Sequence, residues 1–346
     1  MNLKKHLLFA LLILFISSSC KKNSSPVPQS VDVYVAGIFY PGLGEPNACF
    51  WKNGKFNILS TYESQAFGIT SQGNDVYIAG YNGAPVTTGS STACYWKNGV
   101  ITNLSGSSTS SSAIAYAITI SGTDVYVAGS IEKQNGFLTA CYWKNGAITI
   151  LTDNSVGSGA SAIAVNGTDV YVAGVTTPTV GQGVATYWKN GVATYLTPAT
   201  TLSNSDAIAV NGSDVYVAGG ADAANLHMVA TYWKNGQAVS LAKDTSNSYA
   251  ESILLNGSDV LIAGNLTTVN GNGIGVYWKN GIATKVIASY DINAIRINGQ
   301  DTYTSGAVET DLISTPTYWK NGSAVPLSVT YSIGSPIETG MTVVTH

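Results

Sequence analysis

Apolar and polar residues alternate with a period of two along residues 206–241, which read DAIAVNGSDVYVAGGADAANLHMVATYWKNGQAVSL. This alternation is typical of β-strands and not of helices. It predicts four strands, at residues 207–210, 215–219, 230–233 and 237–241. A tight turn joins the first two strands, and Asn235-Gly236 supplies the two positive-φ residues of a type I′ hairpin between the last two.

The four-strand unit occurs seven times. Every tryptophan of the chain stands in a WKNG motif, and successive tryptophans are separated by 45, 47, 45, 45, 45 and 41 residues. A second motif, DVYVAG, keeps step with it, as DVLIAG in the sixth copy and DTYTSG in the seventh. Regular intervals of this length indicate a repeat architecture. The repeated residues are Trp51, Trp96, Trp143, Trp188, Trp233, Trp278 and Trp319, with Asp32, Asp75, Asp124, Asp169, Asp214, Asp259 and Asp301.

Seven such units predict an all-β fold, a seven-bladed β-propeller of four-stranded antiparallel blades over residues 31–346. A blade has about 40–45 residues, and a closed ring leaves no exposed sheet edge. An open solenoid is the alternative. The termini favour the ring, because the first unit lacks its first strand and the last unit is followed by a surplus segment, ETGMTVVTH. We expect Gly340–Thr345 to pair with Val33–Ala36 and close the ring.

The repeated residues have a structural interpretation. Each tryptophan would fill the space between two blades, and its indole Nε1 should find an acceptor. Asp214 begins one strand and Lys234 ends the next, so antiparallel pairing predicts an ion pair between them, repeated in every blade. The alternative is that the seven aspartates surround the channel mouth and bind cations.

Three cysteines share one position, two residues before the tryptophan: Cys49, Cys94 and Cys141. Equivalent positions in neighbouring blades should lie beyond the roughly 7 Å between Cα atoms that a disulfide allows. We therefore expect buried free thiols. The sequence contains neither a Cys-x-x-Cys pair nor a calcium-loop motif, so it predicts no metal site and no other cofactor.

Residues 1–19 have the features of a signal peptide. Lys4 and Lys5 precede an apolar run, Leu7–Ile16, about half the roughly 20 residues that a transmembrane helix needs. The small residues before Cys20 resemble the lipobox of bacterial lipoproteins. This resemblance implies cleavage before Cys20 and its acylation by chains such as palmitate, which would anchor the protein in a lipid bilayer. A plain secretory signal with a free Cys20 is the alternative, because Ser17 stands where such boxes usually carry Leu.

Residues 20–30 should form a disordered tether, since KKNSSPVPQS has two prolines and no apolar periodicity. We expect an outer-membrane lipoprotein of the cell envelope, and Lys21 and Lys22 are compatible with either its periplasmic or its cell-surface side. The chain has 16 Lys and Arg, two of them in the leader, against 19 Asp and Glu. The resulting net negative charge of the mature protein argues against nucleic acid as a partner. We expect a monomer.

The loops differ between the two rims of the predicted ring. One rim has uniform short turns, and the other has segments that differ in every blade, such as YNGAPVTTGSST and GADAANLHM. Function is usually carried by variable loops on a rigid scaffold. The candidate contacts on this variable rim are Tyr40, Tyr81, Phe137, His227, Tyr249 and Tyr290.

Catalytic motifs are weak. A catalytic triad would need His227, but the sequence has no GxSxG elbow, and the only arginine, Arg296, lies on the first strand of the seventh blade. Several of the scattered carboxylates could meet near the axis, where a pair could act on a glycan. They are Glu45, Glu63, Glu132, Asp153, Asp206, Asp222, Asp244, Glu251, Asp291, Glu309, Asp311 and Glu338.

The unit AIAVNGxDVYVAG…ATYWKNGxxxxL resembles the extracellular repeats of the HAF type and the YWKNG-repeat lipoproteins of Bacteroidetes. The resemblance covers residues 31–346 and implies a secreted propeller of undefined biochemical role. Tyr-Trp-Lys replaces the histidine-led strand of the HAF pattern, and no functional residues carry over.

We therefore expect a non-catalytic, membrane-anchored binding module that presents its variable rim to a protein or a glycan. A multivalent lectin with one equivalent sugar pocket per blade is the first alternative. A glycan-active enzyme with carboxylates near the channel is the second, and an envelope scaffold is the third.

Overall fold

The computed structural model describes residues 30–346 apart from residues 43, 84–89, 105, 107–111, 134–135, 154–155, 180–181, 223–226, 243–246, 269, 311–312 and 328–335. Cys20, the predicted signal peptide and the remainder of the predicted tether lie outside the described residues. Val31–His346 is one compact unit. Among the described residues, no helix has the length and the apolar character needed to cross a membrane.

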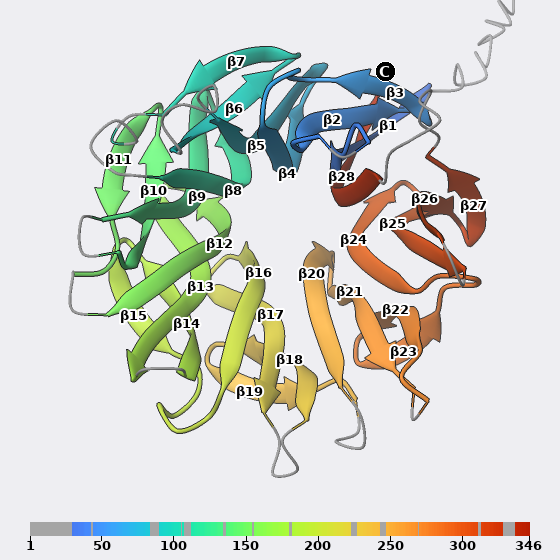
Figure 1. Cartoon of the computed structure of the whole chain (residues 1–346). Helices are drawn as coiled ribbons and strands as arrows, with labels where there is room; N and C mark the ends of the chain where they lie inside the picture. The colour runs from blue at the N-terminus through green and yellow to red at the C-terminus, as the bar shows by residue number, and fades with distance from the viewer. Residues whose placement is uncertain are drawn as a thin grey trace, which may run out of the picture. The chain divides into compact units, whose positions relative to one another are not determined.

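The described chain folds into seven four-stranded antiparallel sheets arranged as a ring, a seven-bladed β-propeller (Figure 1). The innermost strands, for blades 1 to 7, are β28 (Pro336–Thr345), β4 (Ser64–Gln72), β8 (Ala113–Ser121), β12 (Gly157–Asn166), β16 (Ser203–Asn211), β20 (Ser248–Asn256) and β24 (Asp291–Asn298). The second strands are β1 (Val31–Phe39), β5 (Asp75–Gly83), β9 (Asp124–Glu132), β13 (Asp169–Thr179), β17 (Asp214–Asp222), β21 (Asp259–Thr267) and β25 (Asp301–Thr310).

The two outer strands of each blade follow in the same order. The third strands are β2 (Asn47–Lys52), β6 (Ser91–Lys97), β10 (Leu138–Lys144), β14 (Gln182–Lys189), β18 (Met228–Lys234), β22 (Gly273–Lys279) and β26 (Ile313–Lys320). The outermost are β3 (Lys55–Ile58), β7 (Val100–Asn103), β11 (Ala147–Ile150), β15 (Val192–Tyr195), β19 (Gln237–Ser240), β23 (Ile282–Lys285) and β27 (Ser323–Pro326).

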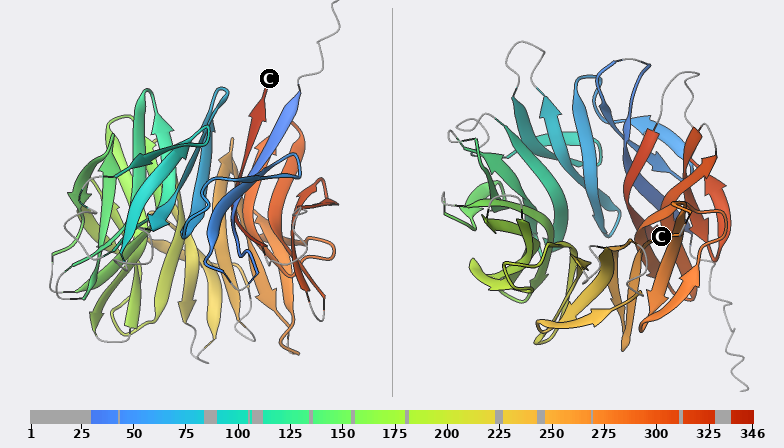
Figure 2. Two further views of the ribbon diagram at one scale, coloured as in Figure 1. Left: turned by 45° about the horizontal axis from the view of Figure 1, so that its top comes forward. Right: turned by 60° about the horizontal axis from the view of Figure 1, so that its bottom comes forward.

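The C-terminal strand closes the ring, as the surplus segment predicts. β28 pairs with β1 in an antiparallel register that runs from Val31 opposite Thr345 to Ala36 opposite Gly340. The two strands lie side by side, one from each end of the chain (Figure 2). The innermost strands contact one another in the cyclic order β28, β4, β8, β12, β16, β20, β24 and back to β28. The propeller prediction is confirmed, and the open solenoid is excluded.

The hairpin turns have the predicted backbone conformation. Asn235 has a φ of 50° and Gly236 a φ of 81°, and the Asn-Gly pairs of the other six WKNG motifs have nearly the same values. Positive φ at both central residues defines a type I′ turn, whose twist matches that of the flanking strands. These turns and the short turns between first and second strands lie on one rim, and the strand ends that flank the variable segments lie on the other.

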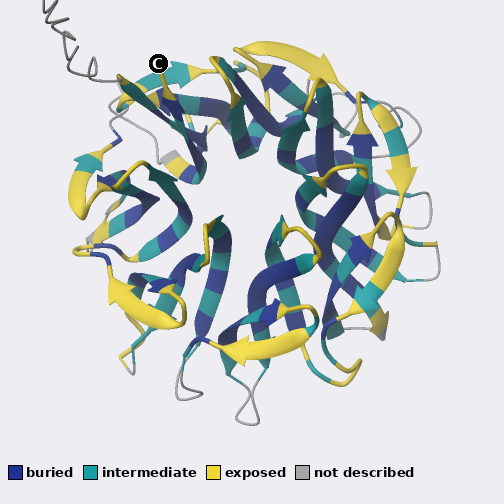
Figure 3. Ribbon diagram, turned by 180° about the vertical axis from the view of Figure 1, so that it is seen from behind, coloured by how far each residue is buried: buried dark blue, intermediate teal, exposed yellow. Residues whose placement is uncertain are grey.

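The tryptophans fill the interfaces between blades. Seven buried clusters each combine residues of two neighbouring blades, and each contains one tryptophan. In one of them, Trp233 of blade 5 packs with Tyr171 and Leu196 of blade 4. All seven tryptophans are at most 1% exposed. Exposed residues instead lie along the outermost strands (Figure 3).

The expectation that every indole Nε1 finds an acceptor is wrong for four blades. The Nε1 atoms of Trp188, Trp233, Trp278 and Trp319 are buried and have no hydrogen-bond partner in the described structure. Apolar side chains of two blades surround these rings, and such side chains provide no acceptor. Burial of the large ring therefore outweighs one unmade hydrogen bond.

The repeated polar residues form one cluster per blade on the rim with the short turns. In blade 5, Lys234 Nζ lies 3.1 Å from Asp214 Oδ2, and Asn235 Nδ2 donates to Asp214 Oδ1 over 2.8 Å. The Asn235 Oδ1 atom in turn accepts from the backbone N–H of Val215. Asn235 and Lys234 lower the pKa of Asp214. The predicted ion pair is present in all seven blades, so these aspartates belong to the scaffold.

The cysteines have the predicted state. Cys49, Cys94 and Cys141 are buried and are not in disulfides. Burial raises the pKa of all three thiols far above the usual range. Protonated, enclosed thiols of this kind are inert packing groups.

Candidate functional site

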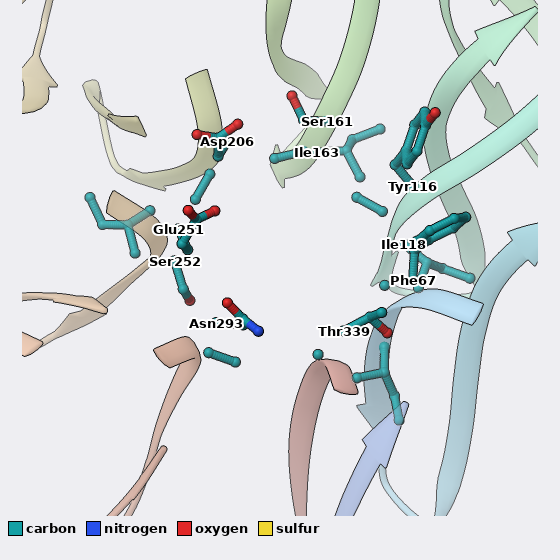
Figure 4. A pocket seen from close by; sticks show the side chains of 18 of the residues that line it. Phe67, Tyr116, Ile118, Ser161, Ile163, Asp206, Glu251, Ser252, Asn293 and Thr339 are labelled. Atoms are coloured by element: carbon teal, nitrogen blue, oxygen red, sulfur yellow. The ribbon is translucent and has the colours of Figure 1, made fainter. Parts of the chain in front are cut away.

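Every innermost strand contains a β-bulge at the same position of the repeat. In blade 5, Ser205 pairs with Gly219 and Ala207 pairs with Ala218, so Asp206 is an extra residue in β16. The register shifts at the same place in the other six innermost strands, β28 included. A bulge re-aims the side chain of the extra residue. Here these side chains point into the central channel (Figure 4).

The repeated glycine of the DVYVAG motif makes room for this bulge. Gly219 of β17 lies opposite the residue before Asp206, and a Cβ atom at Gly219 would collide with the backbone oxygen of Asn204. The same collision, with the carbonyl oxygen two residues before the bulged residue, would occur at every equivalent glycine. These are Gly37, Gly80, Gly129, Gly174, Gly264 and Gly306. One repeated glycine therefore permits a bulge in each blade.

The seven bulged residues differ from blade to blade although the strands around them repeat. We call them the bulge ring: Thr339, Phe67, Tyr116, Ser161, Asp206, Glu251 and Asn293, in the order of blades 1 to 7. In blade 2 the bulge also includes Gly68. The channel wall is thus chemically unsymmetrical at the height of the bulges.

The bulge ring surrounds a cavity of about 480 Å³ in the channel. The residue that follows each bulged residue is small, and five isoleucines continue the wall: Ile69, Ile118, Ile163, Ile208 and Ile253. In blade 7 the wall is completed by Arg296, whose Nη1 donates to the backbone oxygen of Ile295 over 2.7 Å. Burial lowers the pKa of Arg296. A cavity of this volume is in the range of small-molecule sites, about 300–1,000 Å³.

One wall of the cavity is aromatic. The rings of Phe67 and Tyr116 come from neighbouring blades, and their centroids are 5.2 Å apart with an interplanar angle of 48°. Tyr81 lies behind Phe67, with a centroid distance of 6.3 Å. Burial raises the pKa of Tyr116, so its phenol stays protonated and offers an O–H group beside an apolar surface.

The facing wall is acidic (Figure 4). Asp206 and Glu251 lie side by side on adjacent blades, opposite the rings of Phe67 and Tyr116. Burial, and secondarily the charge of Glu251, raises the pKa of Asp206 to about 8. Burial, and secondarily the charge of Asp291, raises the pKa of Glu338 to about 8 and also raises the pKa of Glu251. The expectation that several carboxylates meet near the axis is confirmed for these blades.

Three polar members of the bulge ring donate hydrogen bonds to the next blade. Ser161 Oγ donates to the backbone oxygen of Ser205 over 2.7 Å, and Thr339 Oγ1 donates to that of Ala66 over 2.8 Å. Asn293 Nδ2 donates to Glu338 Oε1 over 2.9 Å. Asp206 and Glu251, the members in blades 5 and 6, make no such hydrogen bond to the next blade in the described structure and therefore interrupt this pattern.

The raised pKa of Asp206 predicts a stability that depends on pH. The folded-state value of about 8 lies above the unfolded value of roughly 4, so the folded chain binds the proton more tightly and stability falls as pH rises between these values. We expect Asp206→Asn to raise the melting temperature at pH 8.5 by about 2 °C or more, because 1 kcal/mol shifts the melting temperature of a domain of about 150–250 residues by about 2–4 °C and that of a larger domain by less. At pH 4.5 the two proteins should melt at similar temperatures.

Thermal denaturation of parent and variant at several pH values measures this difference. Asp75→Asn is the matched control, because Lys97 and Asn98 lower the pKa of Asp75 and its loss should bring no gain at pH 8.5. A variant Asp206→Asn that melts at or below the parent temperature at pH 8.5 would contradict the prediction.

The six candidate residues of the variable rim differ in their exposure to solvent. Phe137 is 50% exposed and Tyr290 is 41% exposed, whereas Tyr81 is buried against Phe67. Tyr40, His227 and Tyr249 are half-buried. Tyr290 and Glu309 line a second cavity, of about 590 Å³, between blades 6 and 7. Neither of the two cavities is lined by more than one of the six residues.

The bulge ring was not predicted from the sequence, although a signal is present. Each bulged residue of blades 2 to 7 stands eight positions before the repeated aspartate, where the copies read Phe, Tyr, Ser, Asp, Glu and Asn. Variation at one strand position within a constant repeat marks a residue that the scaffold does not need. Among the described residues, no three His, Cys, Asp or Glu side chains are placed to hold one metal ion.

Solved structures of very different sequence share the fold. A puromycin-hydrolyzing peptidase from Mycobacterium tuberculosis matches 86% of this chain at 10% identity with a TM-score of 0.55, and this chain spans only 51% of that protein. The β-propeller domain of the Trilobed protease from Pyrococcus furiosus matches 86% of this chain and 94% of its own at 9% identity, with a TM-score of 0.51. At such identities the likeness shows the fold alone. No protein-family model and no curated protein matches the sequence.

Proposed function

We propose that this protein is a non-catalytic binding module that holds a small ligand in its central channel. The bulge ring carries this proposal. The scaffold repeats the same bulge seven times, yet each bulge presents a different side chain to the cavity. The framework is therefore the same in all blades, whereas the chemistry of the cavity lining differs from blade to blade. A rigid, unsymmetrical, partly apolar cavity with a few polar groups has the properties of a ligand site.

We further propose that acylated Cys20 anchors the propeller to the outer membrane, on its periplasmic or cell-surface side. The support is the lipobox-like leader, and the 10 residues after Cys20 would serve as the tether. Replacing Cys20 by Ser should move the protein from the membrane pellet to the soluble fraction after cell lysis. Retention of the Ser variant in the pellet would contradict the anchor.

A binding role is favoured over catalysis by the arrangement of the acidic groups. Asp206 and Glu251 occupy the same wall of the cavity (Figure 4), whereas a glycosidase places its two carboxyl groups on either side of the bond that it cleaves. The enzymes among the structural neighbours share only the fold with this chain. A lectin with one equal pocket per blade would need that pocket to be built from repeated residues, but the repeated tryptophans are buried and the repeated aspartates are paired with lysines.

A channel-filling variant tests the proposal. Position 161 lies in the bulge ring, and the same position holds Phe67 and Tyr116 in blades 2 and 3, so Ser161→Trp should fold while occupying the cavity. A fragment library screened by thermal shift should yield compounds that stabilise the parent. These compounds should lose their effect on Ser161→Trp and keep it on the rim variants Phe137→Ala and Tyr290→Ala.

The opposite pattern would place the site on the variable rim and would indicate a protein or glycan partner there. Compounds that stabilise Ser161→Trp as much as the parent, or a library without any stabilising compound, would contradict a channel ligand.

A further inference from the structure

We infer that the channel ligand is an organic cation with N–H donors, such as an amidine, a guanidine or an amine, attached to a flat or apolar body. The charged group lies against Asp206 and Glu251, and the body lies against Phe67 and Tyr116. This inference rests on the proposed function, and it names the chemical class that the cavity selects.

Charged side chains are unevenly distributed around the cavity. The innermost strands contribute Asp206 from β16, Glu251 from β20 and Glu338 from β28 as acidic groups, and Arg296 from β24 as the one basic group. Asp291, at the start of β24, adds its charge to the field felt by Glu251 and Glu338. The remaining strands present Phe67, Tyr116 and Ser161, which carry no charge at neutral pH. Asp206 and Glu251 occupy neighbouring blades, so their potential adds up on one wall.

Asp206 and Glu251 receive few hydrogen bonds from the protein. In the described part of the chain, Glu251 accepts no hydrogen bond, and Asp206 accepts one, from Asn204 Nδ2. Their equivalents Ser161 and Thr339 are bonded to the next blade because hydroxyl groups can donate. Carboxylates require donors, and the protein supplies one donor to the two of them. Both side chains are half-buried and face the channel, so a ligand there that brings N–H groups supplies the missing donors through charge-assisted hydrogen bonds.

The wall that faces the acidic groups is aromatic. Phe67 and Tyr116 form a continuous aromatic surface, with their ring centroids 5.2 Å apart. Such a surface packs against a flat or apolar body and also attracts a cation through its π-electrons. A single ligand with a charged end and an apolar end therefore satisfies both walls.

A neutral sugar or an anion fits this cavity less well. A neutral ligand would leave the mutual repulsion of Asp206 and Glu251 in place, and an anion would add to it. Arg296 donates to the backbone oxygen of Ile295, and its charge does not contribute to the pKa shift of Asp206 or of Glu251.

The pH dependence of binding follows from the same groups. A bound cation stabilises the ionised carboxylates, lowers their pKa and so displaces protons from Asp206 and Glu338, whose pKa values are about 8 in the free protein. Binding should therefore strengthen as pH rises from 6 to 9 and should release protons. Tyr116 and Arg296 remain protonated over this range, because burial raises the tyrosine pKa and guanidinium stays charged in proteins.

Three compounds of the same shape test the inference: benzamidine, a cation; benzamide, its neutral analogue; and benzoate, its anionic analogue. Isothermal titration calorimetry of the mature chain should show that benzamidine binds at least tenfold more tightly than benzamide and that benzoate does not bind. The benzamidine affinity should rise at least tenfold between pH 6 and pH 9. Titrations in two buffers of different ionisation enthalpy should show proton release.

Variants locate the interaction. Asp206→Asn and Glu251→Gln should each weaken benzamidine binding at least tenfold and leave the benzamide affinity unchanged. Glu132→Gln, at the rim end of β9, is the matched control and should bind like the parent. A circular dichroism melt of each variant confirms that it is folded.

The inference is overturned if benzamide or benzoate binds as tightly as benzamidine, if the affinity is independent of pH, or if both acidic variants bind like the parent. It is also overturned if none of the three compounds binds while fragments of another class bind to the parent and not to Ser161→Trp. In that case the proposal of a channel ligand survives, and only its chemical class is wrong. If no compound of any class binds in the channel, both proposals fail.

Discussion

A chain that ends at residue 335 is expected to lose the closed ring. Deleting residues 336–346 removes the whole of β28, including the buried side chains of Met341 and Val344, and leaves the edge of β1 unpaired. Two interblade clusters, which contain Trp51 and Trp96, would then be open to water. The loss should be of the order of the total stability of a domain, about 5–15 kcal/mol, so we expect no cooperative unfolding transition.

Complementation makes this prediction specific. A synthetic peptide of residues 336–346 should restore a cooperative urea transition when it is added to the truncated protein, because an exposed sheet edge accepts an extra strand. A peptide of scrambled order should have no effect, and deletion of His346 alone, which lies beyond β28, should leave the transition in place. A cooperative transition in the truncated protein without peptide would refute the view that β28 closes the ring.

Replacing Trp233 by Ala should have the second largest effect. The ring is 0% exposed, and it packs between blades 4 and 5 against Tyr171, Leu196 and Val217. Removing a buried aromatic ring deletes its apolar contacts and leaves a cavity, at a cost of about 3–5 kcal/mol. Since the Nε1 atom has no hydrogen-bond partner, this loss reflects packing alone, and Trp233→Phe should recover part of it.

Equilibrium unfolding in urea measures the loss. Tyr195→Ala is the matched control, because Tyr195 is an aromatic residue of blade 4 that is 61% exposed, and its replacement should change the stability by less than about 0.5 kcal/mol. Similar losses in the two variants would argue against the tryptophans as the main interblade packing groups.

The pH predictions and the ligand inference share one physical origin. Asp206 and Glu338 are held in a wall that disfavours their ionised forms, so the free protein is less stable at alkaline pH than it would be without them. The equivalent positions of other blades hold neutral residues, so the fold does not need a carboxyl group at Asp206 or Glu338. Strained or destabilised groups of this kind are typical of ligand sites.

Most of the architecture was predictable because it depends on short stretches of sequence. The Asn-Gly pairs determine the hairpin turns through their backbone preferences, and the alternation of apolar residues determines which face of each strand is buried. Seven copies of the motif and the missing first strand determine the number of blades and the closure by residues 340–345. The ion pair of Asp214 with Lys234 follows from the position of the two residues at adjoining strand ends.

The location of the cavity and its chemistry were decided only by the tertiary structure. A bulge depends on the pairing register of two strands, and here a glycine on the partner strand permits it. The alternation of apolar and polar residues within β16 alone therefore does not reveal that Asp206 is an extra, unpaired residue. Asp206 and Glu251 stand one repeat apart in sequence but adjacent in the ring, and the rings of Phe67 and Tyr116 face them from across it. The raised pKa values require burial by several blades at once. Local sequence therefore specified each blade, whereas the cavity exists only where seven remote segments converge.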